Sequence, residues 1–121
     1  MQFTSEQINE VCERKHITAS GYLGKPGIHN TLSQEFHRQV EIAVIWLQDA
    51  PIIKTITVSS YASKHICETL ANTYVSNGAL LVAVNLLGIP HRKEGLNARL
   101  PISRSWYKKQ MSIAYQPTAK P

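Results

Sequence analysis

The stretch ALLVAVNLL, residues 79–87, is apolar on almost every side, and Asn85 is its one polar residue. Gly88 and Pro90 follow directly and end the helix that this run predicts. A helix that is apolar all round must be covered all round. In a chain of 121 residues, only the centre of the subunit or an interface between two copies can provide that cover.

Short patterns predict the other elements. TSEQ and TLSQ have the spacing of capping boxes and predict helices that begin at Thr4 and near Thr31, the second ended by Pro51. The run IIKTITV, residues 52–58, is rich in β-branched residues and alternates in its second half, which predicts a half-buried strand. An amphipathic helix follows and ends near Tyr74, and LNARLPIS, residues 96–103, predicts a short strand.

Together these elements predict an α+β fold that is mostly α, in one globular domain over residues 1–115. Residues 1–50 would form a helical N-terminal part, 52–89 a strand–helix–helix core, and 90–110 a basic turn and strand. Residues 18–30 hold three glycines and a proline and predict a loop. Residues 116–121 are expected to be a flexible tail.

Charge is distributed unevenly along the chain. Residues 1–50 carry six acids and four bases, whereas residues 51–121 carry two acids and nine bases, within a net charge of +5. A basic half on a small protein is the electrostatic footprint of a polyanion binder. Six of these bases are dense, nearly unopposed and interleaved with Trp106 and Tyr107, which favours a nucleic-acid surface: Arg92, Lys93, Arg99, Arg104, Lys108 and Lys109.

The sequence also indicates the compartment. No window reaches the roughly 18 consecutive apolar residues of a membrane span, and the amphipathic N-terminus has no apolar signal region. We therefore expect a cytoplasmic protein without a membrane partner. Cys12 and Cys67 are expected to be reduced, partly buried thiols.

Strand, helix, short turn and helix, in this order over residues 54–88, resemble a ribbon–helix–helix DNA-binding unit. KTITVSS matches the ribbon of that family, SYASKHICETLANTY its first helix, VSNG the turn, and ALLVAVNLLG the dimer-forming helix. The flanking segments are similar to small regulatory or accessory proteins of conjugative plasmids and integrative elements. The resemblance implies a homodimeric transcriptional regulator of a mobile element that binds double-stranded DNA.

In that family two chains pair their strands into a ribbon that enters the major groove. The resemblance implies base contacts from Ile53, Thr55 and Thr57, with Ile56 and Val58 facing the dimer core. The start of the second helix would hold a phosphate. With the basic residues, the implied phosphate contacts are Lys54, Ser76, Asn77, Gly78, Arg92, Lys93, Arg99, Arg104, Lys108 and Lys109.

Three alternatives stay open. The strand at 96–103 could pair with residues 53–58 of the same chain, so that no ribbon is free to dimerise. In a winged-helix arrangement, the helix after the turn and the segment HRKEG with its strand would form the DNA surface instead. The protein could also be an accessory or inhibitor protein that binds another protein through its apolar helix and Trp106.

The sequence gives no pattern for catalysis. GxSxG, HExxH and glycine-rich phosphate loops are absent, and the chain has a single aspartate, Asp49. Cys12 with His16 and His65 with Cys67 lack the spacing of a closed zinc site. We therefore expect no enzyme activity, no catalytic or metal-binding residues, no cofactor and no small-molecule substrate.

Overall fold

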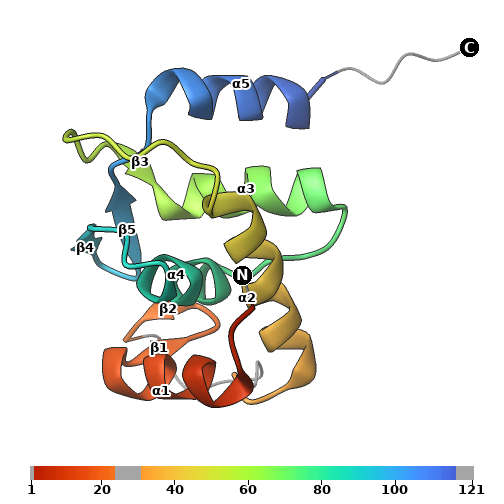
Figure 1. Ribbon diagram of the computed structural model, residues 1–121, viewed down its shortest axis with the longest axis vertical. Helices are drawn as coiled ribbons and strands as arrows, with labels where there is room; N and C mark the ends of the chain where they lie inside the picture. The colour runs from red at the N-terminus through yellow and green to blue at the C-terminus, as the bar shows by residue number, and fades with distance from the viewer. Residues whose placement is uncertain (1, 24–30, 117–121) are drawn as a thin grey trace, which may run out of the picture.

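The computed structural model describes residues 2–23 and 31–116. The elements are α1 (Ser5–Lys15), β1 (Ile17–Thr18), β2 (Gly21–Tyr22), α2 (Gln34–Leu47), β3 (Val58–Ser59), α3 (Ser60–Ala71), α4 (Asn77–Leu86), β4 (Arg92–Glu94), β5 (Asn97–Leu100) and α5 (Arg104–Ala114). They form a mostly helical α+β fold, as predicted (Figure 1). The predicted loop residues 24–30 and tail residues 117–121 lie outside the described residues.

The helix ends follow local capping chemistry. The predicted capping box of α1 is confirmed, because Thr4 and Gln7 bond each other's backbone N–H. The N-cap of α2 is Ser33 rather than Thr31, and its side chain accepts from the Phe36 N–H. Helix α3 ends earlier than predicted, because Asn72 adopts the left-handed conformation (φ 54°) that this residue type tolerates.

Helix α4 lies at the centre of the subunit (Figure 1). It packs against α1, α2, α3, the β1–β2 pair and β5, and every residue from Asn77 to Val84 is buried. The prediction of a fully covered helix is therefore confirmed. Its cover comes from within the same chain, so this helix does not need a second copy to bury it.

Strands β3, β5 and β4 form an antiparallel sheet in that order. Val58 pairs with Leu100 and Ser59 with Arg99, while an isolated bridge joins Ile52 to Ile102. The predicted strand at 52–58 is thus regular only at its end, and it pairs inside the subunit. The backbone groups that a two-chain ribbon would use are already bonded, since Thr57 N donates to Leu100 O and Ile53 N to Pro101 O. Val58 packs in the subunit's own core.

The segment from α2 to β5 runs helix, strand, helix, helix, hairpin. HRKEG folds as strand β4 and the start of a turn rather than only as a turn. Helix α5 was not predicted from the sequence. It packs along α3 on the side away from α4 (Figure 1).

Candidate nucleic-acid interface

The first turn of α4 is covered by the β1–β2 hairpin. Gly78 N donates to Ala19 O (2.9 Å), and Asn77 Nδ2 lies 3.1 Å from both Ser20 O and Leu96 O. Ser76 is buried and its hydroxyl accepts from Ala79 N. The prediction that Ser76, Asn77 and Gly78 bind a phosphate is therefore wrong, because protein groups already occupy their hydrogen-bonding positions.

The burial of α4 also changes the winged-helix alternative. In that arrangement the helix after the turn would contribute to the DNA surface, but α4 is covered on all sides by its own chain. A helix in this position cannot enter a major groove unless α1 and the β1–β2 hairpin move away. Any nucleic-acid surface must therefore lie elsewhere on the subunit.

The predicted base-reading residues do not form a ribbon. Ile53 is 39% exposed and Thr55 is exposed, but both precede β3 in an irregular segment. The Thr57 hydroxyl is buried and has no hydrogen-bond partner within the described parts of the chain. Thr57 therefore faces the protein, and only Ile53 and Thr55 remain accessible.

The outer face of the three-stranded sheet carries a row of polar side chains. Ser59 pairs with Arg99 and Arg99 with Arg92, so one cross-strand row joins all three strands. In β5, Ala98 and Leu100 are buried, whereas Arg99 on the alternate face is partly exposed. The hairpin thus presents two arginines side by side on one face.

Arg99 is held in place from two sides. Its Nε lies 3.2 Å from both carboxylate oxygens of Glu94, and its guanidinium donates to Thr57 O (3.1 Å). The hydrogen bond from Arg99, helped by the charges of Arg99 and Arg92, lowers the pKa of Glu94. Arg92 makes no salt bridge within residues 2–23 and 31–116, so its charge faces solvent.

Lys93 belongs to the opposite face of the hairpin, because it pairs with the buried Ala98. Its ammonium lies 4.7 Å from the centre of the Tyr22 ring. The Tyr22 hydroxyl is 2.6 Å from His91 Nε2 and accepts from Asn85 Nδ2 (2.9 Å), and burial raises the pKa of Tyr22. Lys93 thus connects the hairpin to β2, a contact that the sequence analysis missed.

The remaining predicted cations lie beside the C-terminal end of β5 and along α5. Lys54 is exposed, and it lies near the end of β5 because the N–H of the preceding residue, Ile53, donates to Pro101 O. Arg104 is the first residue of α5. Arg104 and Lys108 are four residues apart and share one side of α5, whereas Lys109 lies a further 100° around the helix. None of these four makes a salt bridge in the described part of the chain.

A cation in the first turn of a helix opposes the helix dipole, and Arg104 occupies that position in α5. Its contribution to stability there is unfavourable by roughly 0.3–1 kcal/mol. A bound phosphate would reverse the sign of this interaction. The position of Arg104 is therefore better suited to an anionic partner than to folding alone.

Both cysteines are free and buried. Burial raises the pKa of Cys12 to about 11 and that of Cys67 to about 12. The thiols are therefore protonated at neutral pH and poor nucleophiles. Over the described ranges no group of three or more His, Cys, Asp and Glu side chains is arranged to hold a metal ion.

Comparison of the chain with models of protein families, with curated proteins and with solved structures finds no match. None of the helices described has the length and apolarity needed to cross a membrane.

Proposed function

We propose that this protein binds double-stranded DNA through the outer face of its β4–β5 hairpin and the adjoining first turns of α5. The observation that carries the proposal is the row of Arg99 and Arg92 across the sheet, continued past the end of β5 by Lys54 and Arg104. Lys108 extends it by one turn of α5. The opposing carboxylate on this hairpin is Glu94, which Arg99 already neutralises.

The same geometry indicates what kind of binding to expect. Lysine and arginine on a hairpin and a helix end make phosphate contacts, which position a protein on DNA without reading its sequence. The helix that would read base edges is buried, and of the three expected base-reading residues Thr57 faces inward. We therefore propose weakly sequence-dependent binding, as in an accessory DNA-binding protein, in place of the base-reading transcriptional regulator that the sequence suggested.

Salt dependence tests this proposal directly. Each phosphate contact contributes about −0.9 to the slope of log Kobs against log salt. Arg99 is already paired with Glu94, so the four other cations of the surface predict a slope of about −3 to −4. Arg92→Ala combined with Arg104→Ala should reduce the slope by about two units and weaken binding to all duplexes to a similar degree. Fluorescence anisotropy with labelled duplexes of different sequence, titrated at several salt concentrations, measures both quantities.

Arg14→Ala combined with Lys15→Ala is the matched control. This variant also removes two positive charges, but from the end of α1, where Arg14 is exposed and pairs with Glu10 on the surface. If charge alone attracts DNA, both double variants lose affinity equally, and the assignment of the surface is wrong. If the wild type shows no salt-dependent binding, the proposal of DNA binding itself is wrong.

A further inference from the structure

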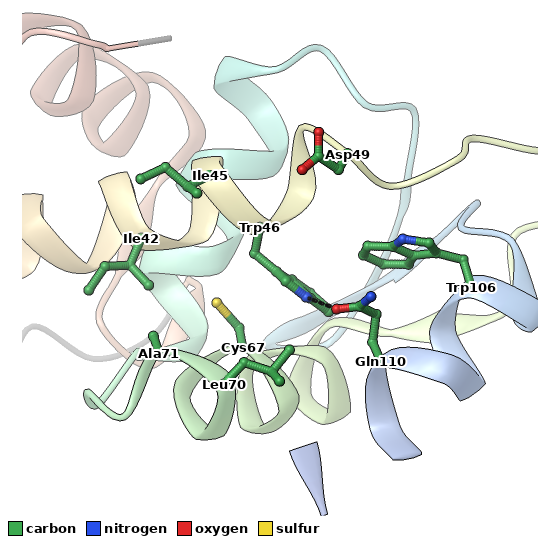
Figure 2. Close-up of a pocket in the computed structure, with 9 residues that line it drawn as sticks. All are labelled: Ile42, Ile45, Trp46, Asp49, Cys67, Leu70, Ala71, Trp106 and Gln110. Atoms are coloured by element: carbon green, nitrogen blue, oxygen red, sulfur yellow. Dashed lines mark hydrogen bonds between the residues drawn. The ribbon is translucent and has the colours of Figure 1, made fainter. Parts of the chain in front are cut away.

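A groove runs between α2, α3 and α5, on the side of the subunit that the proposed DNA surface does not use. It has a volume of about 480 Å³ and is open and mainly apolar. Figure 2 shows Ile42, Ile45 and Trp46 on α2 opposite Cys67 and Leu70 on α3. Trp106 and Gln110 of α5 close one end (Figure 2).

The end of the groove is built from fixed side chains. Trp46 Nε1 donates to Gln110 Oε1 (3.0 Å), and the rings of Trp46 and Trp106 lie 5.2 Å apart between their centres. These contacts join α5 to α2 at that end of the groove (Figure 2). The groove is thus formed before any partner binds.

Apolar side chains continue beyond the groove onto exposed surface. Ile45 is 60% exposed and lies on the side of α2 opposite the buried residues Val40, Ala43 and Leu47. On α5, Ile113 is 51% exposed and lies two turns after Trp106 on the same side of the helix. Exposed apolar residues that extend a groove on two neighbouring helices mark an interaction surface.

Helix α5 itself lacks sufficient cover in the monomer. None of its 11 residues is buried, although Trp106, Tyr107, Gln110 and Ala114 are partly covered. An isolated helix of this length is marginal in water and needs packing on its apolar side. Met111 and Ile113, which flank that side, are still exposed.

The charges beside these apolar residues are complementary. Glu41 lies on α2 one turn before Ile45, and Asp49 lies in the turn just after the end of α2 and lines the groove. On α5, Lys109 lies one turn before Ile113 on the same side of the helix. One copy therefore presents acids around an apolar centre, and α5 presents a cation beside an apolar residue.

We propose that the groove binds α5 of a second copy of this chain in a two-fold symmetric dimer. Ile113 of each copy enters the groove of the other beside Ile45, and Lys109 pairs with Asp49 across the interface. Two-fold symmetry forms this contact twice, which is how a short helix can contribute to an interface of the roughly 1,200–2,000 Å² that stable complexes bury. This dimer uses α2, α3 and α5 rather than the strand that the sequence suggested, and it does not depend on DNA binding.

Sedimentation equilibrium without DNA tests the proposal. The wild type should be dimeric at about 100 µM, a concentration well above the Kd of a micromolar interface. Ile45→Asp should make the protein monomeric, with unchanged helix content by circular dichroism, because Ile45 is mostly exposed in the subunit. A wild-type protein that is monomeric at this concentration would overturn the proposal and would indicate that the groove binds a different protein. A variant Ile45→Asp that remains dimeric would also overturn it.

Charge reversal tests the arrangement of the two copies. Asp49→Lys and Lys109→Glu should each weaken the dimer about tenfold, and their combination should restore much of the affinity. Glu13→Lys, on the exposed side of α1, is the control and should have no effect. If the effects of the two reversals simply add, the proposed docking is wrong.

Tryptophan fluorescence gives an independent readout of the same interface. Both tryptophans of the chain, Trp46 and Trp106, line the groove, so the emission reports on this site alone. Dilution of the wild type through its dissociation range should shift the emission to longer wavelength as the rings become wetter. An emission maximum that stays constant while the mass halves would contradict the proposed site.

Discussion

Gly78→Ala should destabilise the protein by about 3 kcal/mol, although alanine normally stabilises a helix relative to glycine by roughly 0.5–1 kcal/mol. A Cβ atom at this position would lie 1.9 Å from Thr18 O and 2.9 Å from Ala19 Cα. Both are backbone atoms of the β1–β2 hairpin and its turn, so no flexible side chain can move aside. Urea unfolding of the variant and the wild type measures the difference in free energy of unfolding.

Gly95→Ala is the matched control for this prediction. Gly95 has a positive φ of 60° and no heavy atom within 4 Å of a built Cβ, so only the conformational cost remains. That cost is about 1–2 kcal/mol. If Gly78→Ala proves as stable as the wild type, the hairpin does not cover the start of α4 in solution, and the helix could be available to a ligand.

Asn77→Leu should have the second large effect, a loss of about 4 kcal/mol of stability. Asn77 Oδ1 accepts from the Ser60 hydroxyl, which in turn accepts from Ala98 N, all within a buried site. Its Nδ2 lies within bonding distance of Ser20 O, Leu96 O and Asn97 Oδ1. Leucine would leave several of these buried groups without a partner, at roughly 1–3 kcal/mol each.

Asn77→Asp separates hydrogen bonding from shape. The introduced carboxylate would face two carbonyl oxygens in a buried site, so repulsion and burial should raise the pKa of this carboxyl in the folded state. The stability of this variant is then highest below the unfolded pKa of about 3.9 and falls as pH rises. Unfolding experiments at pH 4 and pH 7 measure this, and an equal loss at both values would contradict the bonding assigned to Asn77.

The sequence predicted that α4 would be covered on every side, because the run ALLVAVNLL has no polar side, but it left open whether the cover comes from the same chain or from a second copy. Which elements cover it could not be predicted. The hairpin that covers its first turn consists of two strands of two residues each, too short to show any periodicity. Gly21 and Gly78 were the available signals, since a Cβ on either would overlap the backbone of the segment packed against it.

The strand at 52–58 was predicted from its β-branched residues, but how much of it forms a regular strand depends on the segment with which it pairs. Only Val58 and Ser59 run regularly beside β5, and residues 51–53 pair with the segment after Leu100. Sequence alternation cannot distinguish a strand that pairs within a chain from one that pairs between chains. The expected ribbon was therefore a reasonable interpretation of the sequence that the pairing in the structure does not support.

The basic residues could be named from the sequence, but the face of the sheet on which each one lies could not be predicted. Cross-strand pairing places Arg92 and Arg99 on one face and Lys93 on the other, next to Tyr22. The amphipathic pattern of α5 was present in Trp106, Gln110 and Ile113 and in the N-cap Ser103. The segment was interpreted as basic rather than helical, so neither α5 nor the groove that it helps to form was predicted.

Backbone amide NMR during titration with a short DNA duplex tests the central claim most directly, because it reports every described element at once. The proposal predicts the largest shifts at the outer face of β4 and β5 and in the first turn of α5. It also predicts that the amides of α4 remain unperturbed. Shifts concentrated in α4, or no shifts at any element at low salt, would contradict the claim that this protein binds DNA through its hairpin while its central helix stays buried.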